Sequence, residues 1–234
     1  MTPRTAVDAA AARRALAAGT AVVLPGPAPL THVIAATVPE AVNLAKGRPA
    51  GQAVALWAHD PDTLDSLDEV WDLGPEQRAP LRLLLRRERL TVLLPVRSGA
   101  PRPPWLEPAV REERSLLFGS RWDPLRPVLD EFPVLYVSSA NRTGGPPVAG
   151  TAEALATFPA EVPVLAAPDP AGEDADTGPR AATTTVRIRP DGTLALHRPG
   201  AQDRAHGGPE AYLRHLRAPS DTSGSPSPGP PRVP

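Results

Sequence analysis

The chain of 234 residues contains no cysteine. A disulfide framework, a thiolate metal site and a cysteine nucleophile are therefore excluded, and so is redox chemistry on the chain itself. It also has no long apolar run, because the longest stretch, residues 90–96, contains Pro95 and is too short to span a bilayer. Three arginines and an aspartate interrupt residues 1–19, where a secretory signal needs an apolar region. We therefore expect a cytoplasmic protein with no membrane partner.

The chain also lacks a strong net charge and, with one exception, lysine. Its formal net charge of -1 argues against wholesale wrapping of nucleic acid, so any anion site must be local. Lys46 is the only lysine among the 25 lysine and arginine residues. The ammonium of lysine is a compact point charge, whereas the guanidinium of arginine is a planar group with several donors. A site that needs an ammonium therefore does not freely accept a guanidinium. Lys46 is therefore a candidate functional residue. The alternative is that a single lysine remains in this arginine-rich chain by chance.

The composition is that of a globular protein with one main domain. Hydrophobic residues make up 41% of the chain and charged residues 22%, which is enough for one sizeable core. The 33 prolines are unevenly placed, and residues 218–234 are rich in proline and serine with almost no apolar side chains. Such a segment cannot offset its ordering entropy by burial. We predict one domain over residues 1–217 and a disordered tail over residues 218–234.

Helical and strand patterns alternate along the domain, which predicts an α/β fold. Asp60 followed by Pro61 is typical of a helix N-cap with proline at the first helical position, and we prefer this to a metal cluster with His59. Arginines on the helix at 81–89 indicate a solvated face, with an RNA-contacting face as the sharper alternative. We expect a loop at 169–179, helices at 7–18, 38–45, 81–89 and 151–158, and strands at 21–24, 53–57, 90–94, 134–137, 183–188 and 194–196.

Several familiar motifs are missing. There is no Gly-x-x-x-x-Gly-Lys-Ser/Thr loop and no Gly-x-Ser-x-Gly elbow, and the five histidines show no metal-ligand pairing. No metal site is predicted. What remains is a set of cations, hydroxyls and an amide at expected strand ends and turns, groups that hold a carboxylate or a polyphosphate. The set comprises Lys46, Arg48, Ser138, Ser139, Asn141, residues 183–185 and Arg198.

Four segments in series resemble motifs of the YrdC-like family of L-threonylcarbamoyladenylate synthases. They are Lys-Gly-Arg-Pro at 46–49, Ser-Ala-Asn-Arg-Thr-Gly-Gly-Pro-Pro at 139–147, Thr-Thr-Val at 184–186 and Arg-Pro-Gly-Ala at 198–201. In element order the resemblance covers about residues 6–201. It implies a YrdC-like fold of the dsRNA-binding type, in which flanking helices cover a twisted mixed sheet around a concave basic cavity.

The resemblance also implies an activity. Threonine, bicarbonate and ATP, the last as a complex with Mg²⁺, would give threonylcarbamoyl-adenylate and pyrophosphate, and the product would serve tRNA threonylcarbamoyladenosine modification. By carry-over, Lys46, Arg48, Ser139 and Asn141 would be the catalytic tetrad. The nucleotide would be bound by Ser138, Thr184, Thr185 and Arg198. The alternatives are that Asn141 only forms a turn, that Ser139 caps the backbone and that the threonines are plain strand residues.

The chain departs from the family pattern in four places, one of which is Gln-Ala-Val at 52–54 where Lys-Pro-Leu is usual. Residues 25–31 read Pro-Gly-Pro-Ala-Pro-Leu-Thr where the family has Pro-Thr-Asp/Glu-Thr-x-Tyr/Phe-Gly. Residues 87–91 replace a Pro-Gly-Pro segment, and residues 118–122 replace a Val-Arg-x-Pro segment, where Arg121 is a positional substitute for the arginine. Two hypotheses follow: a synthase, or a variant of it for another amino acid or carbamoyl donor, and a non-catalytic paralogue that binds nucleotide or double-stranded RNA.

Overall fold

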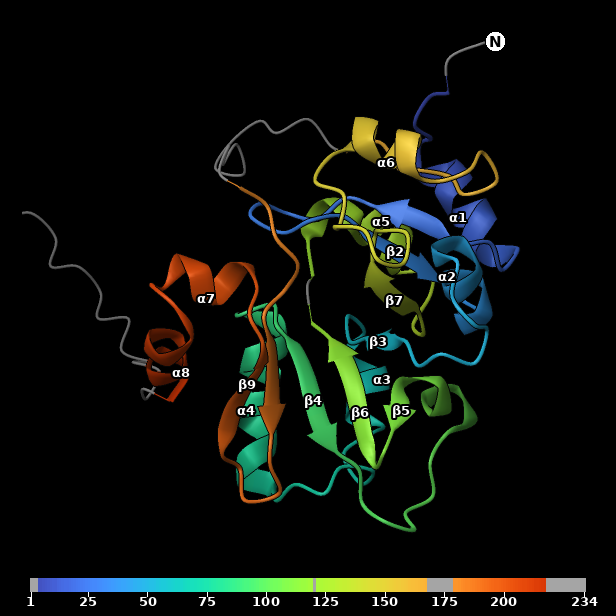
Figure 1. Cartoon of the computed structure of the whole chain (residues 1–234). Helices are drawn as coiled ribbons and strands as arrows, with labels where there is room; N and C mark the ends of the chain where they lie inside the picture. Colours follow the sequence, from blue (N-terminus) through green and yellow to red (C-terminus); the bar gives the residue numbers. More distant parts are fainter. Residues whose placement is uncertain (1–3, 120, 168–178, 218–234) are drawn as a thin grey trace, which may run out of the picture.

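The computed structural model describes residues 4–119, 121–167 and 179–217. The predicted tail at 218–234 and nearly all of the predicted loop at 169–179 lie outside these residues. The described part forms one nine-stranded mixed sheet with flanking helices, as the sequence predicts (Figure 1). None of the described helices is long and apolar enough to cross a membrane.

The strands follow the order β1-β2-β7-β3-β6-β4-β8-β9, with β5 paired to β6. Two pairs, β3 with β6 and β4 with β8, are parallel, and the other pairs are antiparallel. The strands are β1 (Val22–Leu24), β2 (Val33–Ala36), β3 (Ala55–Trp57), β4 (Thr91–Pro95), β5 (Val110–Arg111), β6 (Arg114–Phe118), β7 (Tyr136–Ser139), β8 (Thr185–Ile188) and β9 (Leu194–Arg198). The α-helices are α1 (Ala9–Ala17), α2 (Pro39–Lys46), α3 (Pro61–Asp65), α4 (Pro75–Arg86), α5 (Arg126–Leu129), α6 (Thr151–Thr157), α7 (Ala201–Ala205) and α8 (Pro209–Arg217).

Helices cover both faces of the β1-β2-β7 half of the sheet. Successive side chains of a strand point to opposite faces. Val33 of β2 therefore packs in a cluster with α1 and α5, whereas Ile34 packs in another cluster with α2 and α6. Because both faces are buried, β1 and β2 are wholly apolar, whereas β7 ends in the less buried Ser138 and Ser139.

The β6-β4-β8 half is covered on one face by α4. Val92 of β4 and Val186 of β8 pack there against leucines of the helix, and Figure 1 shows α4 behind β4 and β9. Tyr212 of α8 is buried in the same cluster, and its hydroxyl donates to Glu88 at 3.1 Å. Thr91 and Leu116 belong to the opposite face and line a cavity.

The structure confirms several local predictions. The Asp60 side chain accepts a hydrogen bond of 2.7 Å from the Thr63 amide at the start of α3, as expected for an N-cap. The predicted hairpin forms between β8 and β9. Helix α4 begins at Pro75, six positions before the predicted start, because Pro75 occupies its first turn and Pro80 is tolerated within it. Strands β2, β5 and β6 were not predicted.

Candidate functional site

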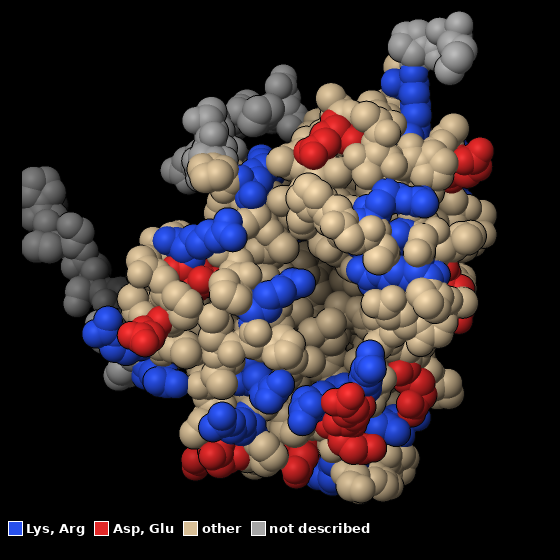
Figure 2. Space-filling view, in the orientation of Figure 1, with Lys and Arg blue, Asp and Glu red and all other residues tan. Residues whose placement is uncertain are grey.

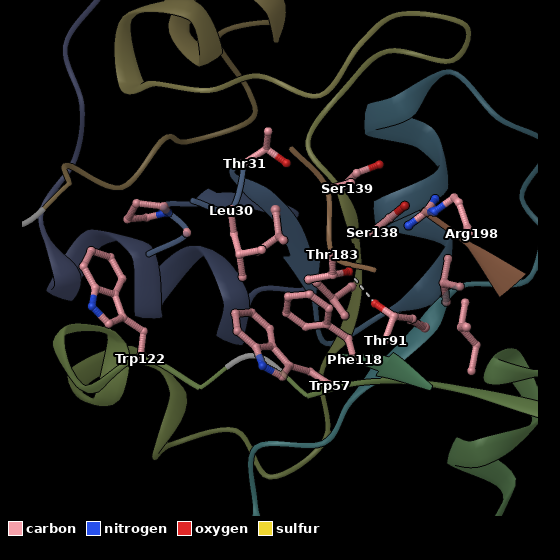
Figure 3. Close-up of a pocket in the computed structure, with 18 of the residues that line it drawn as sticks. Leu30, Thr31, Trp57, Thr91, Phe118, Trp122, Ser138, Ser139, Thr183 and Arg198 are labelled. Carbon is pink, nitrogen blue, oxygen red and sulfur yellow. Dashed lines mark hydrogen bonds between the residues drawn. The ribbon is translucent and has the colours of Figure 1, made fainter. Parts of the chain in front are cut away.

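A cavity of about 210 Å³ lies on the open face of the sheet. It is hollowed into the face shown in Figure 2, with basic side chains along its rim. Figure 3 shows that its walls come from segments distant in the sequence: the loop after β1, the middle strands β3, β6 and β7, and the approach to β8. Such a concave site with a few convergent polar groups is the usual form of a small-molecule site.

One end of the cavity is basic and rich in hydroxyls. Arg48 follows α2, and its Nη2 donates to the Ser138 hydroxyl of β7 at 3.3 Å. Arg198, the last residue of β9, lies near Ser138 and Ser139 (Figure 3). Among the described residues, none forms an ion pair with either arginine, and no aspartate or glutamate lines the cavity. These uncompensated cations beside hydroxyl donors make this end a site for an anion.

Lys46 does not line the cavity; it lies behind its wall. It is the last residue of α2, which ends where Gly47 adopts a left-handed conformation with φ of 70°. Its side chain is fully buried. Its Nζ donates to the Ser139 carbonyl, to the Asn141 carbonyl at 3.0 Å and to Oδ1 of Asn141 at 2.6 Å. These contacts engage all three donors of the ammonium.

Two opposing effects act on the protonation of Lys46. Burial, followed by the nearby charges of Arg48 and Arg198, lowers the pKa of Lys46 to about 7. The three oxygen acceptors favour the protonated form instead, because a neutral amine has only two N–H donors. The net result is a lysine that titrates near neutral pH.

Asn141 organises the turn after β7. Its Oδ1 accepts from the Ser139 hydroxyl at 2.7 Å, and its Nδ2 donates to the carbonyls of Arg142 and Gly145 at 2.9 Å. Ser139 lines the cavity while Asn141 does not. The structure thus brings Lys46, Ser139 and Asn141 into one hydrogen-bonded group and presents Ser138 and Ser139 to the cavity.

Thr184 and Thr185 are placed differently from the other candidate residues. Both are buried, and neither is among the cavity-lining residues. The Thr184 hydroxyl donates to Asp203 of α7 at 2.6 Å, and the same carboxylate accepts from the Gly200 amide at 2.6 Å. The preceding Thr183 does line the cavity, where its hydroxyl lies 2.5 Å from that of Thr91.

The other end of the cavity is apolar, and sequence reasoning missed it. Its wall combines Trp57, Phe118 and Trp122 with the loop after β1 (Figure 3). Arg180 fixes this loop by donating to the carbonyls of Gly26 and Leu30, both at 2.8 Å. The loop turns so tightly that a Cβ on Gly26 would lie 2.4 Å from the Thr31 carbonyl oxygen. Only their bulk marked these aromatic residues in the sequence, and bulk is equally typical of core residues.

No protein-family model matches the sequence, and no curated protein matches it either. Several solved structures do match the chain. The P. abyssi Sua5 structure complexed with L-threonine superposes with a TM-score of 0.60 at 17% identity, over 84% of this chain and 56% of that one. E. coli YciO gives a TM-score of 0.58 at 14% identity, over 82% of this chain and 88% of its own. The fold is YrdC-like.

A phosphate- and nucleotide-bound HypF structure shares the YrdC-like fold, with a TM-score of 0.57 at 16% identity over 86% of this chain and 30% of that one. The chain spans about half the length of the Sua5 structures that it matches. The family resemblance carried by the four motifs is thus confirmed at the level of the fold. In this YrdC-like chain three of those motifs reach the cavity, through Arg48, Ser139 and Arg198, and Thr184 faces α7 instead.

Proposed function

We propose that the chain is an adenylate-forming enzyme of the L-threonylcarbamoyladenylate synthase type, which joins an amino acid, bicarbonate and ATP to give an aminoacyl-carbamoyl adenylate; with threonine as the amino acid, that product serves tRNA threonylcarbamoyladenosine modification. One observation carries the proposal: Arg48 and Arg198 converge with two serine hydroxyls on a cavity that no carboxylate of the described part of the chain lines. Such a site favours ligands with concentrated negative charge.

The reaction requires that kind of site. The amino group of the amino acid adds to the carbon of bicarbonate with loss of water, which gives a carbamate. A carbamate oxygen then attacks the α-phosphorus of ATP, and the bond from that phosphorus to the bridging oxygen breaks, so that pyrophosphate leaves. Negative charge accumulates on the phosphoryl oxygens, and positioned guanidinium groups stabilise it.

The described contacts suggest distinct roles for the candidate residues. Arg48, Arg198, Ser138 and Ser139 contact the anionic part of the substrates. Lys46 and Asn141 are positioning residues, because their polar atoms are engaged in holding the turn that carries the serines. Thr184 joins β8 to α7 and does not contact the nucleotide.

Mg²⁺ enters this scheme as part of the ATP substrate. No group of three or more histidine, aspartate or glutamate side chains among the described residues is arranged to hold a metal ion. Mg²⁺ retains several waters and is commonly bound through substrate phosphates. The phosphates of ATP would therefore carry the ion to the basic end of the cavity.

The comparisons support the proposal. The Sua5 structure is complexed with L-threonine and the HypF structure is in a phosphate- and nucleotide-bound form, and these are the kinds of ligand that the proposed reaction uses.

A pyrophosphate-release assay tests the proposal. Release should require ATP, bicarbonate and an amino acid together, and Arg48→Gln should reduce it at least tenfold. Arg111→Gln is the matched control, since Arg111 is an exposed arginine that does not line the cavity. If no amino acid stimulates release with Mg²⁺ or Mn²⁺ present, the proposal is rejected.

One observation favours binding without catalysis. The loop at 25–31 offers the cavity one hydroxyl, that of Thr31, and no carboxylate. A non-catalytic relative would still bind nucleotide or double-stranded RNA. Calorimetry with ATP alone, and filter binding with double-stranded RNA at several salt concentrations, would distinguish these two ligands.

A further inference from the structure

The apolar end of the cavity is formed by aromatic side chains that packing holds in place. Trp57 and Phe118 pack edge to face, with ring centroids 5.2 Å apart and an interplanar angle of 75°. Both rings are almost completely buried, which fixes their position, while Trp122 is partly exposed and closes the same side (Figure 3). Together they form an apolar wall at the end of the cavity distant from Arg198 (Figure 3).

The loop after β1 completes this wall and is held in place. Pro25, Pro27 and Leu30 all line the cavity. The two hydrogen bonds from Arg180 and a backbone hydrogen bond of 3.0 Å from Ala181 to the Pro29 carbonyl tie the loop to the approach to β8. Because the prolines restrict the backbone, the wall is formed before a ligand binds.

The charges of the cavity restrict what can bind across it. Within residues 4–119, 121–167 and 179–217, Arg48 and Arg198 are the only charged residues in the lining. An α-ammonium group would meet two cations and no anion there, whereas a carbamate carries no positive charge. An amino acid in its carbamate form therefore fits, with its anionic groups at the arginines and its side chain directed to the apolar end.

The same wall disfavours polar groups. A side-chain hydroxyl placed against Phe118, Leu30 and Pro27 would give up its hydrogen bonds to water without finding a partner among these side chains, which have no polar side-chain atom. The hydroxyls of Thr91 and Thr183, which also line the cavity, are bonded to each other. A nucleobase stacks its ring face readily on aromatic side chains, and only an edge turned toward this wall would meet the same obstacle. An apolar side chain meets none and gains from leaving water.

We infer that the amino-acid substrate of this site has a branched aliphatic or aromatic side chain, which binds against Trp57, Phe118 and Trp122. The inference rests on the proposed function, because it names the substrate class of that reaction. It makes the chain a variant of the synthase type that uses an amino acid other than threonine.

A comparison of valine with threonine tests the inference directly, because the two side chains have the same shape and differ by a methyl in place of a hydroxyl. In the pyrophosphate-release assay kcat/KM should be about tenfold higher for valine than for threonine. Leucine or phenylalanine should be better still, since each fills more of the apolar end. A preference for threonine over valine would overturn the inference and leave the proposed function standing.

Replacement of Trp122 tests whether the apolar end of the cavity determines the specificity for the amino acid. Trp122→Ala should raise KM for leucine or phenylalanine about tenfold, with little change in KM for ATP, because the side chain acts only at the apolar end. Trp105→Ala is the matched control, since Trp105 is a partly buried tryptophan packed against the core and does not line the cavity. Equal effects of the two replacements would contradict the assignment.

A binding experiment separates failure of the inference from failure of the proposed function. If no amino acid supports pyrophosphate release, the proposed function is rejected, and calorimetry with N-carbamoyl-leucine and N-carbamoyl-threonine still decides the subsite. Binding of the leucine derivative at least tenfold tighter supports an apolar subsite. Equal binding, tighter binding of the threonine derivative or no binding of either overturns it.

Discussion

The side-chain oxygen of Asn141 accepts a hydrogen bond of 2.6 Å from Nζ of Lys46, which lies 95 positions earlier in the chain. The contact ties the end of α2 to the turn after β7, directly behind the two serines of the cavity. Lys46 and Asn141 were singled out in the sequence as ligand-binding groups. In the structure they bind each other, and the cavity receives Ser138, Ser139 and Arg48 from the segments that they join.

Loss of the Lys46 ammonium should destabilise the fold. Lys46→Met removes a fully buried donor and leaves the oxygens of Ser139 and Asn141 without it, which costs about 1–3 kcal/mol. Lys46→Arg should not rescue the loss, because a planar guanidinium does not match acceptors grouped around one nitrogen. Urea unfolding measures the difference, and a midpoint unchanged in both variants would contradict the structural role.

The low pKa of Lys46 should make stability rise with alkaline pH. The folded pKa is about 7 and the unfolded value is about 10.5, so between these values the unfolded state binds the extra proton. Raising the pH from 7 to 9.5 should therefore increase the free energy of unfolding, by an amount on the order of a few kcal/mol.

The composition makes this experiment clean, because the chain has no cysteine and no second lysine to titrate in the same range. The window ends near pH 10, where Tyr212 ionises only on unfolding because burial raises its folded pKa. Urea midpoints at pH 7, 8, 9 and 9.5 give the slope. Lys46→Met should flatten it, and an equal slope in the variant would assign the effect elsewhere.

The two cavity arginines should control anion affinity without supporting the fold. Arg48→Gln and Arg198→Gln should each weaken ATP binding about 10- to 100-fold, because each removes a charge-assisted hydrogen bond. Their melting temperatures should stay within a few degrees of the parent chain, since neither arginine forms an ion pair with a described residue. Calorimetry measures the affinity, with Arg111→Gln as the control expected to bind ATP normally.

Thr184 should contribute to stability and not to ligand binding. Thr184→Val keeps the shape of the side chain but leaves the buried Asp203 without one of its donors, which costs about 1–3 kcal/mol. The dissociation constant for ATP should change less than twofold. A large loss of affinity with unchanged stability would instead support the role in nucleotide binding that the sequence motif suggested.

Acid should destabilise the chain through its buried histidines. Burial lowers the pKa of His32 and of His59 to about 4, so each stays neutral in the folded state while its unfolded form takes up a proton below pH 6.5. Stability should therefore fall as the pH drops from 6.5 toward 4. His59→Phe should weaken this dependence, and His215→Asn, at an exposed position on α8, should not. Identical acid profiles in all three proteins would refute this explanation.

Local patterns predicted much of the fold. The N-cap at Asp60, the hairpin of β8 and β9 and the strands around residues 22–24 and 91–94 follow from capping chemistry, turn residues and apolar runs, which act over a few positions. Strand β2 escaped prediction because its four residues are buried on both faces and show no alternation. Strand β6 lies next to an acidic turn, and its burial depends on neighbours far away in the sequence.

The candidate site was predictable in its chemistry and not in its geometry. The residue types at 46–48, 138–141 and 198 indicate an anion site whatever the fold. Which of them face the cavity depends on strand direction and helix ends, so that Thr183 reaches the cavity and Thr184 does not. The apolar end has no sequence signature, because tryptophan and phenylalanine are equally expected in a core.

The sequence by itself determined the reactive inventory: no thiol, one lysine amine, and arginines in excess of acids at the motifs. Composition is a property of the chain and needs no partner. The tertiary structure alone decided that the amine of Lys46 donates its hydrogen bonds within the chain and that two arginines lie beside serines without an ion-pair partner among the described residues. It also decided that aromatic rings lie at the other end of the same cavity. Those outcomes depend on contacts between segments nearly a hundred residues apart, which no local pattern encodes.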